Sequence, residues 1–121
     1  MRNYQNLDAW KVSMQLVKII YTSVKGFPKE ELYGLTSQIK RAAVSIPANI
    51  AEGMGRQYKK DTIQFLHIAR GSVYELKTLL NIAVTVNFLP QTQFHELLLL
   101  IDDAIKLLNG LINYMMKAEL K

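Results

Sequence analysis

Residues 29–52 read KEELYGLTSQIKRAAVSIPANIAE, and the spacing of their apolar side chains decides the fold class. Apolar residues recur there at alternating steps of three and four, which places them on one face of an α-helix. The stripe consists of Leu32, Leu35, Ile39, Ala42, Ile46 and Ile50. This stretch therefore predicts a long amphipathic helix.

Pro47 lies inside this stripe, where a proline is expected to kink or break a helix. Proline has no backbone N–H, so its hydrogen bond to the carbonyl of Ala43 cannot form. The apolar spacing nevertheless continues on both sides of the proline. We therefore predict that the helix runs through Pro47 and bends there.

Three further stretches of the chain carry stripes of the same kind. The stripes are Leu7, Trp10, Met14, Val17, Tyr21 and Val24, then Ile63, Leu66, Ala69, Val73, Leu76, Leu80 and Ala83, then Phe94, Leu98, Ile101, Ile105, Leu108, Ile112 and Met115. Gly26 and Pro28 end the first, and Asn87 is a suitable left-handed stop for the third.

The predicted helices cover about residues 7–25, 29–52, 61–86 and 91–117, and no strand-like alternation competes with them. Short connections between long helices predict that neighbours in sequence lie side by side and run in opposite directions. At 121 residues there is room for one core. We expect an all-α, antiparallel up-down-up-down four-helix bundle, in a single domain over residues 1–121.

Composition excludes several classes of protein. The chain has no cysteine, which excludes disulfide-stabilised proteins, cysteine-ligated zinc fingers and thiol-dependent enzymes. Its longest purely aliphatic run, Leu97–Ile101, is far shorter than the roughly 20 residues of a membrane helix. No apolar signal-peptide segment follows the first residues. The prediction is a soluble, cytoplasmic protein that does not contact membranes.

No constellation of catalytic or metal-binding residues is found in the sequence. Neither His67 nor His95 has a carboxylate three residues before it, as di-iron bundles require. Gly53 and Gly55 follow a predicted helix and lack the remaining positions of a phosphate-binding loop. We expect no enzymatic activity, no cofactor, no metal and no small-molecule substrate.

The fourth predicted helix has more apolar surface than one core face needs, since fifteen of the twenty-three residues from Phe94 to Met116 are apolar. A second apolar row lies beside the first, and Leu99 falls within the polar strip. Either the helix lies deep among its own neighbours, or part of it contacts another subunit. The predicted subunit interface consists of Leu97, Leu99, Leu100, Leu107 and Tyr114.

Basic residues exceed acidic ones, giving a formal net charge of +5. The densest cluster is Arg56, Tyr58, Lys59 and Lys60, and two of its lysines fall where a helix dipole opposes positive charge. A second row, Lys11, Lys18 and Lys25, repeats every seven residues on the first helix. Both sets are candidates for binding nucleic acid. The alternative for the second row is an ordinary solvated face.

Polar residues also form a row along the second predicted helix. Arg41, Ser45, Asn49 and Glu52 recur at steps of three and four residues. They are expected to face Arg70 and Glu75 of the third helix in a hydrogen-bonded seam that fixes helix register. The alternative is a solvated face.

Two long stretches resemble a known family. Residues 38–53 (QIKRAAVSIPANIAEG) and 65–76 (FLHIARGSVYEL), with residues 7–11 (LDAWK) and 33–35 (YGL), are similar to bacterial four-helix-bundle proteins encoded in intervening sequences of large-subunit ribosomal RNA genes. The resemblance implies a subunit that assembles into a ring, typically a homopentamer, without enzymatic activity. Relatives include the accessory protein of diversity-generating retroelements, which binds nucleic acid and a reverse transcriptase through a positively charged ring.

Two functional hypotheses follow. The first is an oligomeric accessory protein that binds RNA or DNA through a basic surface. The second is a protein–protein scaffold or assembly module without a nucleic-acid role. Salt dependence separates them, because phosphate binding releases counterions and weakens steeply with salt, whereas apolar docking does not.

Overall fold

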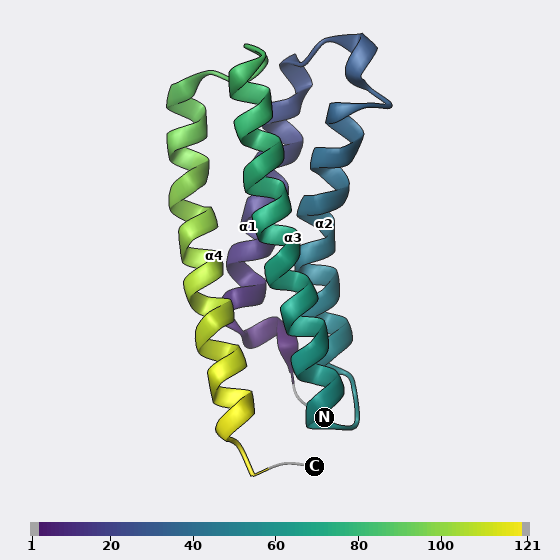
Figure 1. Cartoon of the computed structure of the whole chain (residues 1–121), viewed down its shortest axis with the longest axis vertical. Helices are drawn as coiled ribbons and strands as arrows, with labels where there is room; N and C mark the ends of the chain where they lie inside the picture. Colours follow the sequence, from purple (N-terminus) through teal and green to yellow (C-terminus); the bar gives the residue numbers. More distant parts are fainter. Residues whose placement is uncertain (1–2, 120–121) are drawn as a thin grey trace.

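The computed structural model describes residues 3–119, which contain helices and no strand. The four long helices are α1 (Asp8–Ser23), α2 (Leu35–Met54), α3 (Lys59–Thr85) and α4 (Gln91–Lys117), as Figure 1 shows. Three short 3-10 helices accompany them: η1 (Tyr4–Asn6), η2 (Val24–Gly26) and η3 (Lys29–Glu31). The prediction of an all-α fold with four helices is confirmed.

Each long helix packs against two others. The pairs in contact are α1 with α2, α2 with α3, α3 with α4, and α4 with α1. In Figure 1 the α1–α2 and α3–α4 connections lie at the upper end, and the α2–α3 connection lies at the lower end. Between the helices runs one apolar core, whose largest fully buried side chains are Leu16, Ile20, Ile39, Ile46, Ile50, Leu66, Leu76, Leu80, Leu97, Ile101, Leu108 and Met115.

The buried face of α1 differs from the predicted stripe. The residues of α1 that are buried are Ala9, Ser13, Leu16 and Ile20. Met14 and Tyr21 of the predicted stripe are each 42% exposed. The predicted stripe was wrong at these two positions, whereas Val24 is buried and Leu7, Trp10 and Val17 pack against the core. Helix α1 carries apolar residues on more than one face, so two rows satisfy the helical period. Close packing selected the row with small and aliphatic side chains.

Helix α2 begins later than the predicted residue 29. Residues Lys29–Glu31 form the separate turn η3, and Gly34 has a non-helical backbone (φ −113°, ψ −114°). The carboxylate of Glu31 accepts a hydrogen bond from the N–H of Leu35 at 3.1 Å. That bond satisfies one of the free donors at the start of α2. Leu32 therefore lies in a turn before α2 and is 51% exposed.

Pro47 lies inside α2, which continues to Met54, so the prediction of a helix through this residue is confirmed. The ring is buried, as are Ala42 and Ala43 one turn earlier. The bend at Pro47 stays a prediction.

The turn from α2 to α3 depends on one close approach. Gly53 is buried in the last turn of α2, and an added Cβ would lie 2.7 Å from Cβ of Phe65. The hydroxyl of Thr62 donates to the carbonyl of Gly53 at 2.7 Å. Helix α3 consequently starts at Lys59, two residues before the predicted residue 61, and Tyr58 at its N-cap makes no side-chain capping bond.

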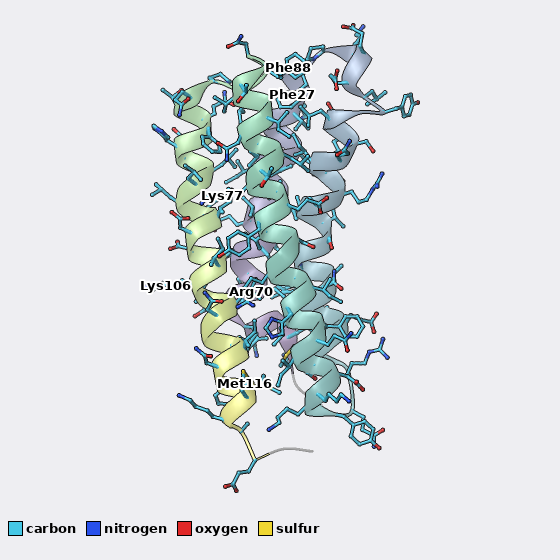
Figure 2. The ribbon with its side chains drawn as sticks, viewed as in Figure 1. Phe27, Arg70, Lys77, Phe88, Lys106 and Met116 are labelled. Atoms are coloured by element: carbon cyan, nitrogen blue, oxygen red, sulfur yellow. The ribbon has the colours of Figure 1, made fainter. Side chains whose placement is uncertain are left out.

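Asn87 ends α3 in the left-handed conformation that the sequence predicts, with φ of 66°. The N–H of Phe88 donates to the carbonyl of Ala83 at 2.8 Å, and the N–H of Asn87 donates to Val84 at 3.0 Å. This pair of bonds is the Schellman motif, which satisfies carbonyls at a helix end. Phe88 then meets Phe27 with ring centroids 5.8 Å apart, at the upper end of the structure (Figure 2).

We expect Asn87→Ala to lower the free energy of unfolding by about 1 kcal/mol, because a side chain with a Cβ and no local hydrogen-bonding group is strained at positive φ. Asn87→Gly is the control, since glycine adopts this conformation without strain. Urea denaturation at equal chain concentration measures both. Equal midpoints for the alanine variant and the natural chain would contradict the role assigned to Asn87.

Candidate nucleic-acid interface

The densest basic cluster of the sequence lies at the lower end, around the α2–α3 connection. Arg56 is already engaged there: its Nη2 lies 3.1 Å from Oε2 of Glu52, and its guanidinium lies 4.7 Å from the ring centroid of Phe65. Tyr58 is 49% exposed, and Lys60 is exposed. Glu52 offsets part of the positive charge of this cluster.

Lys59 has a structural contact that the sequence does not reveal. Its Nζ donates to the carbonyl of Ala118 at 3.1 Å and to that of Met116 at 3.5 Å. Positive charge is stabilising beside the last carbonyls of a helix, and Lys59 supplies it to the end of α4. This contact explains why a lysine occupies the first turn of α3, where its own helix dipole opposes it. Lys59 is thus only partly available to an external anion.

The basic row of α1 is arranged differently. Lys11, Lys18 and Lys25 are all exposed. The first two lie in α1, which contains no carboxylate after Asp8, and Lys25 lies in η2. In the cluster at the lower end, Arg56 and Lys59 have partners, whereas in the α1 row only Lys11 has a carboxylate within its own helical turn, that of Asp8 three residues earlier. Sequence spacing alone predicted this row.

The structure adds a hollow that sequence reasoning missed. It has a volume of about 730 Å³ and lies between the upper end of α1, η3 and the first turns of α2. Four lysines line it, namely Lys18, Lys25, Lys29 and Lys40, and no carboxylate does. Lys40 reaches across from α2, with its Nζ 4.8 Å from the ring centroid of Tyr21 on α1. We name these four lysines and the space between them the lysine hollow.

Lys29 and Lys40 were not predicted as site residues because they fall outside the seven-residue repeat of Lys11, Lys18 and Lys25. Pro28 and the η3 turn carry Lys29 back toward Lys25, and the packing of α2 on α1 brings Lys40 beside Tyr21. The only sequence signal was the predicted side-by-side packing of these two helices, which does not specify register.

The predicted polar seam is divided between two helix pairs. Between α2 and α3, Oγ of Ser45 lies 2.8 Å from Oγ of Ser72. Asn49 donates to the carbonyl of Ser45 at 2.8 Å and to its Oγ at 2.9 Å. Ser72 is buried and was absent from the prediction. Among the predicted members, Ser45 and Asn49 therefore join one hydrogen-bonded group.

Arg70 instead joins α3 to α4 (Figure 2). Its Nη1 donates to Oδ1 of Asn109 at 2.7 Å, and its Nη2 lies 2.9 Å from Nδ1 of His67. Arg41 and Glu75 both line a smaller hollow of about 350 Å³ at the α2–α3 surface. The expected register-fixing contact of Arg70 thus faces α4, on the other side of α3.

The predicted interface residues of α4 differ in exposure. Leu97 is 1% exposed and belongs to the subunit's own core, so its inclusion was wrong. Leu100 and Leu107 are half-buried. Leu99 and Tyr114 are 70% and 66% exposed. The apolar excess of α4 therefore serves the core at Leu97 and reaches the outer surface at Leu99 and Tyr114.

The described residues 3–119 contain no group of three or more His, Asp or Glu side chains that could hold a metal ion. Within the same range, no helix has the length and hydropathy needed to cross a bilayer.

Comparisons with known proteins support the resemblance seen in the sequence. The protein-family model described as "23S rRNA-intervening sequence protein" matches residues 5–110. No curated protein matches the chain. A solved structure with a similar fold is the 1.70 Å crystal structure of a protein of unknown function of the S23 ribosomal protein family from Bacteroides thetaiotaomicron VPI-5482. The two have a TM-score of 0.78 and 24% identity, over 87% of this chain and 95% of that one.

Proposed function

The chain belongs to the 23S rRNA-intervening sequence protein family, and on that premise we propose that it is a non-enzymatic, oligomeric accessory protein that binds RNA or DNA through a basic surface. The observation that carries the proposal is the lysine hollow, which four lysines and no carboxylate line, together with the exposed Lys11 on α1.

This surface has the chemistry of phosphate binding rather than of sequence reading. Lysine ammonium groups neutralise phosphates and release condensed counterions, which supplies sequence-independent affinity. Four lysines around one concavity present more charge to a single backbone segment than the same lysines spread over a convex helix. The binding should therefore be sequence-tolerant and strongly salt-dependent. Assembly of such subunits, each an antiparallel four-helix bundle, into a ring would repeat the surface once per subunit.

We expect Lys18→Gln with Lys25→Gln to weaken binding of a labelled RNA about tenfold near 50 mM salt and to lower the slope of log affinity against log salt by roughly 2. Fluorescence anisotropy titrations at about 50 mM and about 200 mM salt measure both quantities.

The matched control is Lys106→Gln with Lys117→Gln, which removes the same charge from α4. Lys106 lies on α4 in Figure 2, away from the hollow. Equal effects of the two double variants would show that net charge, and not this surface, governs binding. An RNA affinity that does not change between the two salt concentrations would contradict the proposal itself.

A second candidate function is an assembly module whose ligand is another protein. Leu99 and Tyr114 favour it, since they expose large apolar side chains, 70% and 66%, on the helix that carries more apolar residues than one core face needs. In the same titration this function predicts no RNA affinity at any salt concentration.

A further inference from the structure

The lysine hollow has an apolar wall that phosphate binding alone does not need. Tyr21 and Leu32 line it and are 42% and 51% exposed, while Phe27 and Val24 close its floor and are 8% and 4% exposed. Phe27 marks this upper end of the structure in Figure 2. A ligand with only charged groups would leave Tyr21 and Leu32 facing water. Cationic rim and apolar wall together fit a ligand that is anionic at one end and flat and apolar at the other.

The arrangement of Lys40 and Tyr21 brings these two chemistries together. With Nζ 4.8 Å from the ring centroid, Lys40 is attracted to the face of Tyr21 and is held beside the apolar wall. The other three lysines line the same hollow from α1, η2 and η3. A phosphate held by these ammonium groups would therefore lie directly beside the surface formed by Tyr21 and Leu32.

We infer that the hollow binds one unstacked nucleotide of a single-stranded RNA or DNA, with its base on the wall of Tyr21 and Leu32 and its flanking phosphates on the four lysines. This inference rests on the proposed nucleic-acid function and specifies its substrate class. A duplex offers its phosphates to lysines but keeps its base faces stacked. Only a single strand offers both a phosphate and a free base face to the same site.

The size of the hollow favours a nucleotide over a protein segment. A volume of about 730 Å³ lies within the range of small-ligand sites, roughly 300 to 1,000 Å³. An acidic amphipathic helix would need a longer groove with apolar contacts spaced over two turns. The apolar residues of this hollow are gathered at one end of the bundle, around the α1–α2 connection.

The test compares a single strand with a duplex of the same length, about twelve nucleotides, by fluorescence anisotropy. The full chain should bind the single-stranded RNA more tightly at equal phosphate concentration. Leu32→Ala and Tyr21→Ala should each weaken single-strand binding about tenfold and change duplex binding by less than about twofold. Tyr21→Phe should retain the affinity, because it keeps the ring.

Ile82→Ala is the matched control, since it removes an apolar side chain that is 44% exposed on α3. Thermal melting monitors the fold of each variant. Leu32→Ala serves if Tyr21→Ala is unstable, because Leu32 lies in a turn outside the helices.

Several outcomes would overturn the inference. If the wall variants leave single-strand binding unchanged, or weaken both nucleic acids equally, no base occupies the wall, although salt-dependent binding would keep the proposed function. Competition by poly-glutamate as effective as that by the single strand, at equal charge, would identify an acidic peptide as the ligand. Absence of binding to either nucleic acid would remove the inference and the proposed function together.

Discussion

Gly53→Ala is expected to destabilise the protein by roughly 1 to 3 kcal/mol, although alanine is the better helix former. The new Cβ would lie 2.7 Å from Cβ of Phe65 and 3.1 Å from the carbonyl oxygen of Thr62. Neither atom belongs to the flexible end of a side chain. The ends of α2 and α3 must therefore separate, which also weakens the 2.7 Å bond from Thr62 to the carbonyl of Gly53.

Gly71→Ala supplies a matched control with the opposite sign. Gly71 is exposed in the middle of α3, and an added Cβ there would meet nothing within 4 Å. Because glycine costs helix stability through backbone entropy, this variant should gain about 0.5 to 1 kcal/mol. Urea denaturation midpoints, compared at one chain concentration, measure both changes. Equal shifts of the two variants would show that the close approach at Gly53 does not determine the turn.

The helical period of the sequence was sufficient to predict how many long helices there are and roughly where they lie. It was sufficient because every long helix has one face buried in a common core. Periodicity does not specify which of two apolar rows faces inward, and α1 shows this: Leu16 and Ile20 are buried, whereas Met14 and Tyr21 are exposed. The start of α2 was missed for a local reason, since Gly34 breaks the helical path that the apolar spacing suggests.

The candidate site was harder to predict because its residues are joined by tertiary contacts. Lys59 looked like a free cation in the sequence, and it bonds the carbonyls of Met116 and Ala118 at the other end of the chain. Lys29 and Lys40 looked unrelated to the α1 row, and the turn at Pro28 and the α1–α2 register bring them to it. A count of charges cannot distinguish a lysine that bonds helix carbonyls from lysines that gather around a hollow, because the difference depends on which segments meet in the fold.

The exposed apolar side chains of α4 lead to a prediction about the oligomeric state of the protein. We expect a closed homo-oligomer, a pentamer of about 69 kDa, which is five times the 13.8 kDa chain. The exposed fractions of Leu99 and Tyr114, 70% and 66%, support contact with another subunit. A heterologous interface closes into a ring only at a suitable rotation per subunit, and the exposed residues of α4 do not specify that rotation. The number five therefore comes from the family resemblance alone.

Leu99→Glu with Tyr114→Glu should release the subunits and give a 13.8 kDa species in light scattering behind a sizing column. Each new carboxylate would lose its hydration in the subunit contact without gaining a partner, and every repeat of the interface in the oligomer would add to the cost. Ile82→Glu, on the outer face of α3, is the control and should leave the mass unchanged. A monomeric natural chain throughout the micromolar range would contradict the interface on α4. A tetramer or hexamer would preserve that interface and contradict only the subunit number that the family resemblance implies.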